Sequence, residues 1–311
     1  MADGEWILVR RQTTKRRAPA KATARMGHHS VAHKTSSQQN VMEAFDPNTR
    51  VSDAKRATIE AQVDRVSQIL LSNEAVLADI LLGIKALLTS LEPEKAPEQA
   101  LHIVNYGLGS FCSSTNATYQ LAFIKALAEA VRKAHPTVQL TLEIYDPVMN
   151  ASDRDIASHF GVATIEENEC AKREVQTKTV FFMPHCGKTL YENVLATNWT
   201  SRLGDTVVIG NSFEAYSDRL IDSTARKSSL LVRVLPYISE TTVSLNVLRD
   251  RDDFTLFEAA FNDLSIHTFP NETLEAALGD EELGVIVANV LNPSNDDERD
   301  DRELIKASST A

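Results

Sequence analysis

Two helical patterns precede the main part of the sequence. From residue 52 to residue 70, apolar side chains recur three or four positions apart, and Ser52 offers an N-cap. A wider apolar face follows between residues 76 and 88, where Asn73 offers the cap, and a charged, proline-containing stretch comes after it. We therefore expect residues 51–99 to form a helical lead-in that packs against the main domain.

Short apolar runs then alternate with helical stretches as far as about residue 270. The predicted strands are 101–105, 139–145, 179–183, 205–209 and either 230–235 or 241–247. The predicted helices are 116–134, 152–160, 189–199 and 213–220. This alternation is typical of an α/β fold, here with a mostly parallel, Rossmann-like sheet flanked by helices.

The two ends of the chain differ from this middle part in composition. Residues 1–50 hold few large apolar side chains and many basic and small polar ones, which predicts a disordered N-terminal arm. After residue 270 come a short amphipathic stretch, 274–278, an apolar run, 284–291, and an acidic tail, 296–303. The expected organisation is thus an arm (1–50), a lead-in (51–99), an α/β domain (100–270) and a C-terminal extension (271–311).

Charge is distributed unevenly along the 311 residues. The net charge is -11, yet residues 1–40 carry eight basic against two acidic side chains, so residues 41–311 carry -17. An acidic domain repels phosphates, so we do not expect it to bind nucleic acid, and any polyanion contact falls to the arm. The arm's cluster Lys15-Arg16-Arg17 resembles a nuclear-import signal.

Two further observations bear on the compartment. No apolar run reaches the roughly 18 to 20 residues that a membrane span needs. The three cysteines, Cys112, Cys170 and Cys186, are too few and too scattered for a disulfide framework or a metal knuckle, which indicates a reducing environment. We expect a cytoplasmic or nuclear protein, or one found in both compartments, without membrane contact.

The loops that follow the first four predicted strands carry the candidate chemistry. Because the carboxyl ends of parallel strands meet at one edge of a sheet, these loops are expected to lie together and to bind a small, nucleotide-like ligand. Two glycines in the first loop let the backbone approach a phosphate or another anion. The ligand-binding candidates are Gly107, Gly109, Ser110, Asp146, His185, Asn211 and Ser212.

Each candidate also has a structural explanation. An aspartate before a proline, such as Asp146, commonly builds a turn, and Asn211 or Ser212 can cap the helix that follows. The third glycine of the dinucleotide fingerprint is replaced by Cys112, and no P-loop sequence occurs. His185 is the best candidate for acid-base chemistry, but no partner can be assigned to it, and a nucleophilic pair with Cys186 has little support. Neither a catalytic set, a metal site nor a cofactor is predicted.

Several motifs at these loops occur together in one order. They are residues 106–111 (YGLGSF), 119–122 (YQLA), 145–147 (YDP), 183–186 (MPHC), 190–193 (LYEN), 198–199 (NW), 210–213 (GNSF) and 261–267 (FNDLSIH). With them, residues 100–270 resemble the Sensitivity-to-Red-light-Reduced (SRR-like) family. The resemblance implies a regulatory protein of light signalling, circadian timing or haem synthesis, with protein partners that are not identified. It brings no established enzymatic activity and no catalytic residues.

Two hypotheses of different classes follow. The first is a non-enzymatic regulator that binds partner proteins. The alternative is a Rossmann-like enzyme or small-ligand sensor that uses the strand-end loops.

Overall fold

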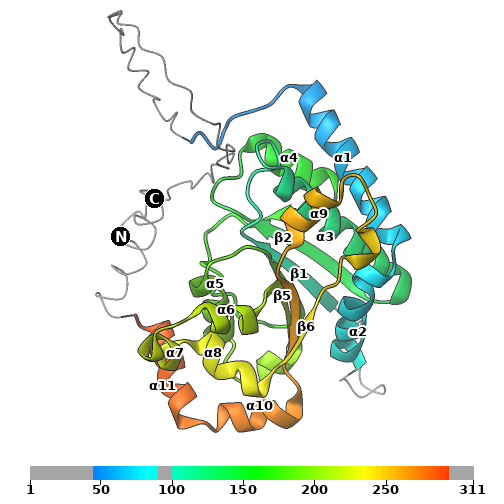
Figure 1. Ribbon diagram of the computed structural model, residues 1–311. Helices are drawn as coiled ribbons and strands as arrows, with labels where there is room; N and C mark the ends of the chain where they lie inside the picture. Colours follow the sequence, from blue (N-terminus) through cyan, green and yellow to red (C-terminus); the bar gives the residue numbers. More distant parts are fainter. Residues whose placement is uncertain (1–44, 90–99, 294–311) are drawn as a thin grey trace, which may run out of the picture.

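The computed structural model describes residues 45–89 and 100–293 (Figure 1). Residues 1–44 of the predicted arm, the stretch 90–99 and the predicted acidic tail lie outside the described residues. The described part of the arm, residues 45–50, runs along helix α4 (Ala151–His159), where Arg154 donates to the carbonyl of Pro47 at 2.8 Å. Arg50 forms an ion pair with Asp155 of the same helix.

A seven-stranded sheet forms the centre of the molecule. Its strand order is β3-β2-β1-β4-β5-β7-β6. The strands are β1 (Ala100–Tyr106), β2 (Gln139–Tyr145), β3 (Ala163–Thr164), β4 (Lys178–Met183), β5 (Thr206–Asn211), β6 (Ser239–Thr242) and β7 (Leu264–Thr268). Strands β1 to β5 are parallel, and β7 runs antiparallel to both β5 and β6. The predicted mostly parallel α/β fold is confirmed.

Helices cover both faces of this sheet. One face carries α1 (Asp53–Ser72), α2 (Ala75–Thr89), α3 (Thr115–Ala134), α4 and α9 (Phe254–Phe261). The other carries α5 (Lys188–Thr197), α6 (Phe213–Arg219), α8 (Leu230–Val234), α10 (Asn271–Leu278) and α11 (Glu281–Leu291), with the short α7 (Ser223–Ser228) beside α8. Strands β4 and β5 are buried between these layers, which explains their continuous apolar sequences.

The two N-terminal helices belong to the same hydrophobic core as the sheet. Helix α1 starts at the predicted cap, where Ser52 accepts from the backbone N–H of Lys55, and it packs on α3. Helix α2 crosses the sheet so closely that a Cβ on Gly83 would lie 2.6 Å from a methyl group of Ile266 in β7. The lead-in is therefore continuous with the core, and the predicted domain boundary near residue 100 stays a prediction.

The structure corrects one strand prediction and shifts its alternative. Residues 230–235 form helix α8 and the start of a 3-10 helix, because Leu230, Leu231 and Val234 bury a helical face. The fifth predicted strand is instead found at β6, which overlaps the alternative range 241–247 at its first two residues. Strands β3 and β7 were not predicted: β3 has only two residues, and β7 is an antiparallel strand in which Ser265 and His267 are buried with their apolar neighbours.

Candidate functional site

The four strand-end loops lie at one edge of the sheet, and neighbouring loops are joined by hydrogen bonds. The backbone N–H of Gly109, after β1, donates to Asp146, after β2, at 2.7 Å. The thiol of Cys186, after β4, donates to the carbonyl of Tyr106 in β1 at 3.4 Å. The N–H of His185 donates to the side chain of Asn211, at the end of β5, at 2.7 Å. The structure thus brings the loops together, while ligand binding by them stays a prediction.

The first loop needs its two glycines. Gly107 and Gly109 have φ values of 74° and 84°, in the left-handed region that favours glycine. A Cβ on Gly107 would lie 2.5 Å from the sulfur of Cys186. Ser110 is buried, and its carbonyl accepts from the N–H of Ser113 and Ser114 ahead of α3. The loop has the shape of an anion-binding turn, but side chains of the protein itself pack against it.

The carboxylate of Asp146 binds the backbone of the glycine loop. One carboxylate oxygen accepts from Gly109 and the other from the N–H of Val148 at 2.9 Å, which also builds the turn expected before a proline. Burial raises the pKa of Asp146, and the two N–H groups oppose that rise. The side chain of Asp146 thus takes up an N–H group of the glycine loop that a ligand could otherwise bind.

A second aspartate, Asp153, supports the same loop and was not predicted. Its carboxylate is fully buried and accepts from the N–H of Cys112 and of Asn150, both at 2.9 Å. The side chain of Asn150 accepts in turn from the N–H of Asp153, which completes a capping box at the start of α4. The spacing of Asn150 and Asp153 was the sequence signal for this pair.

His185 is exposed, but its ring already has a partner. Its φ of 58° places a non-glycine residue in the left-handed region. Nε2 lies 3.0 Å from the carbonyl of Ala260 in α9, and because a carbonyl only accepts, Nε2 carries the proton. The same carbonyl accepts from Gln120 at 3.0 Å. The ring therefore links the third loop to α9, and its role in acid-base chemistry stays a prediction.

Cys186 is poorly suited to be a nucleophile. Desolvation raises the pKa of its thiol, and the nearby carboxylate of Asp146 adds to that rise. The thiolate, which is the reactive form, is thus disfavoured. This argues against a Cys186–His185 nucleophilic pair.

Asn211 and Ser212 hold the fourth loop. The side chain of Asn211 bonds the backbone of both His185 and Cys186, and its N–H donates to the hydroxyl of Tyr191 at 2.8 Å. Ser212 caps α6 by accepting from the N–H of Ala215 at 2.9 Å, as the structural alternative predicts.

Below this loop lies a buried pair, Glu240 and His267, that sequence reasoning missed. A Glu240 oxygen accepts from the N–H of Phe213 and of Glu214 at 3.1 and 3.2 Å, and lies 3.4 Å from Nε2 of His267. Nδ1 of His267 donates to the carbonyl of Val208, and its ring stacks on Phe213 at 3.9 Å. Burial alone would raise the pKa of Glu240, but the nearby ring of His267 and the hydrogen bonds from Ser212 and the backbone outweigh it and lower that pKa to about 2.

The open space at this edge is small. A hollow of about 30 Å³ lies at the ends of β4 and β5, next to the basic side chains of Lys188 and Arg219. That is room for a water molecule and far below the roughly 300 Å³ of a small-molecule site. Lys188 pairs with Glu192 at 3.3 Å and Arg219 with Asp263 at 2.9 Å.

The described residues hold neither a metal-binding cluster nor a helix that could span a membrane. No group of three or more histidine, cysteine, aspartate or glutamate side chains is placed to hold a metal ion there. Within the same ranges, no helix combines the length and the apolar character that crossing a bilayer requires.

Comparison with known proteins agrees with the motifs at these loops. The model of the SRR1 domain matches residues 84–268. The chain belongs to the SRR1 domain family. The matched SRR1 domain begins inside α2 and ends with the last residue of β7, so that α1, α10 and α11 lie outside it.

Three relatives carry the same family name. The chain is 33% identical to the SRR1-like protein of Mus musculus over 63% of its own length and 77% of the relative's. It is 32% identical to Protein SENSITIVITY TO RED LIGHT REDUCED 1 of Arabidopsis thaliana, over 55% of its own length and 60% of the plant protein's. It is 30% identical to the SRR1-like protein of Drosophila melanogaster, over 62% and 63% respectively. The matches thus cover less than two thirds of the plant and fly proteins.

Other motif residues of the SRR1 domain join separate segments of the chain by hydrogen bonds. Glu192 in α5 accepts from the side chain of Ser229 and the N–H of Leu230 at the start of α8. Asn193 donates to the carbonyl of Cys170, at 2.9 Å. Asn198 accepts from the N–H of Val175 and donates to the carbonyl of Arg173. The last two residues hold the irregular segment 165–177, which replaces a crossover helix between β3 and β4.

Proposed function

We propose that this SRR1-domain protein is a non-enzymatic regulator that binds other proteins and controls light signalling, circadian timing or haem synthesis. Membership of the SRR1 domain family is the reason for proposing these processes, and the name of the plant relative refers to red-light sensitivity. The protein acts in the cytoplasm, the nucleus or both. Its protein partners are to be identified, and the acidic folded part does not bind nucleic acid.

One observation carries the non-enzymatic part of this proposal. At the edge where a Rossmann-like enzyme holds its ligand, the polar groups bind one another. The carboxylate of Asp146 fills the glycine loop, the thiol of Cys186 packs on Gly107, and the ring of His185 is bonded to Ala260. An edge closed in this way supports a binding role that uses the outer surface of the loops.

Co-purification of the full chain from cells tests the proposal. Wild type is compared with His185→Ala and Arg219→Ala, which alter exposed side chains of the strand-end edge, and with Val285→Ala, an exposed position of α11 on another surface. A reproducible partner whose recovery falls with the first two variants and not with the third supports the regulator. Recovery of background proteins alone, under gentle conditions, contradicts it.

The second candidate is a small-ligand sensor or Rossmann-like enzyme, which the hollow beside Lys188 and Arg219 favours. Its ligand carries a negative charge, as a nucleotide does, and the site opens to admit it. Thermal unfolding is measured with nucleotides, S-adenosylmethionine and haem. A ligand at one hundred times its dissociation constant stabilises by about 2.7 kcal/mol. No shift across the panel, or equal shifts in wild type and Arg219→Ala, removes this candidate.

A further inference from the structure

Strand β6 is an open edge of the sheet. Among the described strands it pairs with β7 alone. The backbone N–H of Val243, just after β6, donates to the carbonyl of Leu264, and bonded pairs alternate along an antiparallel ladder. The N–H and C=O groups of Glu240 and Thr242 therefore point away from β7, and they form no hydrogen bond with any described residue. Strand β6 thus offers free donors and acceptors to a further strand.

The sequence of β6 does little to prevent such pairing. Edge strands are commonly protected by lysine, proline or a bulge. Residues 239–242 (SETT) contain neither lysine nor proline, and their register with β7 is unbroken. The opposite edge of the sheet, β3, has only two residues. The position at which the sheet can take up a further strand is therefore β6.

Helix α2 lies next to this open edge. Helix α3 lies over β4, where the rings of Phe123 and Phe182 stack at 5.1 Å. Helix α2 lies over β7, because a Cβ on Gly83 would meet the side chain of Ile266. The strand order continues from β4 through β5 and β7 to β6. The side of α2 that is turned away from α3 therefore faces the open edge.

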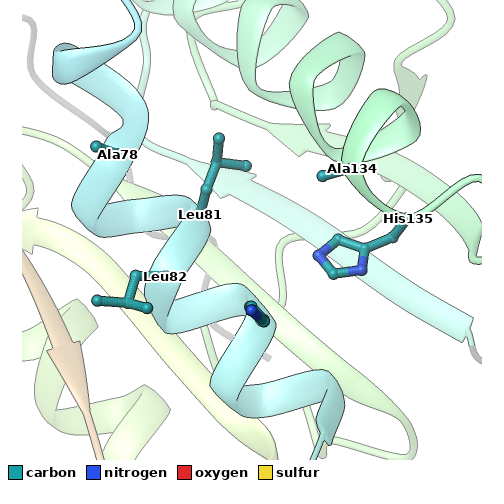
Figure 2. A pocket seen from close by; sticks show the side chains of 6 residues that line it. Ala78, Leu81, Leu82, Ala134 and His135 are labelled. Carbon is teal, nitrogen blue, oxygen red and sulfur yellow. The ribbon is translucent and has the colours of Figure 1, made fainter.

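That side of α2 carries a negative charge. Figure 2 shows Leu81 directed toward the end of α3, beside a hollow of about 380 Å³, and Leu82 on the other side of the helix. At about 100° per residue, Asp79 lies around the helix between Leu82, on the outward face, and Gly83. Asp79 is exposed and has no ion-pair partner among the described residues. A strand that adds to β6 is therefore favoured by a positive charge.

The chain itself contains a segment with this chemistry. Residues 6–9 (WILV) are the longest run of large apolar residues ahead of residue 45, and tryptophan, isoleucine and valine favour strands. Two arginines, Arg10 and Arg11, follow directly. Residues 10–44 can span about 115 Å, far more than the width of a domain of this size. The segment can thus reach β6, and the basic arm and the acidic remainder of the chain attract each other.

We propose that residues 6–9 bind along β6 of the same chain as a further strand of the sheet. Their backbone groups bond those of Glu240 and Thr242, and the two arginines that follow lie near Asp79. Few hydrogen bonds form, so the segment docks reversibly, aided by the high effective concentration of a tethered segment. The docked segment covers the edge and keeps it from pairing with other chains.

Amide hydrogen exchange of the full chain, resolved to single residues, tests the proposal. The two outward N–H groups of β6 should exchange at least about tenfold more slowly in wild type than in Ile7→Pro/Leu8→Pro, because adjacent prolines remove a donor in either register. The matched control is Ser36→Pro/Ser37→Pro, which makes the same change in a polar part of the arm. This control should exchange as wild type does.

The fluorescence of Trp6 reports docking from the other partner. In a Trp199→Phe background Trp6 is the only tryptophan of the chain, and its emission maximum should lie at a shorter wavelength when the segment is docked. Thr242→Pro removes an outward N–H that β7 does not use, and should shift this maximum to that of an exposed tryptophan. Thr242→Ala keeps the N–H and should leave the maximum unchanged.

Three results would overturn the proposal. The first is equal exchange of the outward N–H groups in wild type and in Ile7→Pro/Leu8→Pro, a comparison that does not depend on how Thr242→Pro folds. The second is an emission maximum of Trp6 that is the same in Thr242→Pro and in Thr242→Ala. The third is a dependence of either readout on protein concentration between about 1 and about 100 µM, which would place a second copy at β6, since docking within one chain is independent of concentration.

Discussion

The strand-end edge and the exposed side of helix α2 differ in whether their side chains have partners within the protein. At the edge, the polar groups of four loops are bonded to one another, so that a glycine-rich loop holds a carboxylate of its own protein. On the exposed side of α2, Leu82 is 65% exposed, and neither Asp79 nor Lys85 has an ion-pair partner among the described residues. The comparison teaches that polar side chains at a sheet edge can be bound to one another and closed to a ligand, whereas an exposed apolar side chain such as Leu82 adds little to the core of the monomer.

The largest effect is expected from a substitution that disrupts the close packing of the strand-end edge. Gly107→Ala should lower the free energy of unfolding by about 2–4 kcal/mol, because of the positive φ and the contact with Cys186. Urea denaturation measures it, and Gly187→Ala, where an added Cβ meets nothing within 4 Å, is the control. Adding Cys186→Ala should recover the part that is due to the clash. An unchanged urea midpoint for Gly107→Ala would show that the edge is loosely packed.

Lowering the pH tests how much the buried carboxylate of Glu240, next to His267, stabilises the fold. The pKa of Glu240 falls from its ordinary 4.5 to about 2 in the folded protein, so its carboxylate stabilises fully above about pH 4.5 and loses this contribution as the pH falls toward 2. That shift corresponds to on the order of 3 kcal/mol at neutral pH. Urea titrations of Glu240→Gln and wild type should therefore differ at pH 7 and converge toward pH 2. The control is Glu214→Gln, which changes an exposed neighbouring side chain. If the free energies of unfolding of Glu240→Gln and wild type differ by the same amount at every pH, the carboxylate does not have this role.

A smaller effect tests the contact between Asp146 and the glycine loop. Asp146→Ala leaves the N–H groups of Gly109 and Val148 without their acceptor, which should cost about 1–2 kcal/mol of unfolding free energy. Sulfate, compared with chloride at equal ionic strength in a thermal unfolding assay, should then stabilise the variant more than wild type. Equal responses of both proteins would mean that Asp146 builds a turn and nothing more.

The smallest effect belongs to the other side of the comparison. Leu82→Ala should change the free energy of unfolding by less than about 0.5 kcal/mol in dilute solution, since the side chain contributes little to the core of the monomer. Urea denaturation at low concentration measures this, next to Val285→Ala. A loss comparable to that of Gly107→Ala would show that Leu82 is already covered within one chain.

The sequence predicted the parts of the fold that depend on chain periodicity. Continuous apolar runs identified β4 and β5, and the rule for parallel strands brought their loops to one edge. The run that became α8 was ambiguous, because four apolar residues with a single Arg233 among them suit a buried strand and a short buried helix alike. Strand β7 was not predicted, because it joins the sheet antiparallel and its polar His267 is buried through a contact with Glu240, 27 residues earlier in the chain.

At the candidate site, the sequence could not predict in which direction the side chains point. Asp146 and Gly109 were both candidates, but whether the carboxylate turns toward the loop or toward a ligand depends on how β1 and β2 are aligned. The same holds for His185, whose partner is a backbone carbonyl of α9 and has no sequence signal of its own. The outward face of α2, in contrast, can be read from helical spacing once its buried face is known.

The two aspartates that hold the glycine loop come from the second strand–helix unit, whereas the N–H groups they accept from belong to the first. During synthesis the loop leaves the ribosome before either carboxylate exists. Until residue 153 has followed, its amides are left to solvent or to passing ions. The glycine turn is therefore expected to mature late, as a joint between two units that each begin to fold separately.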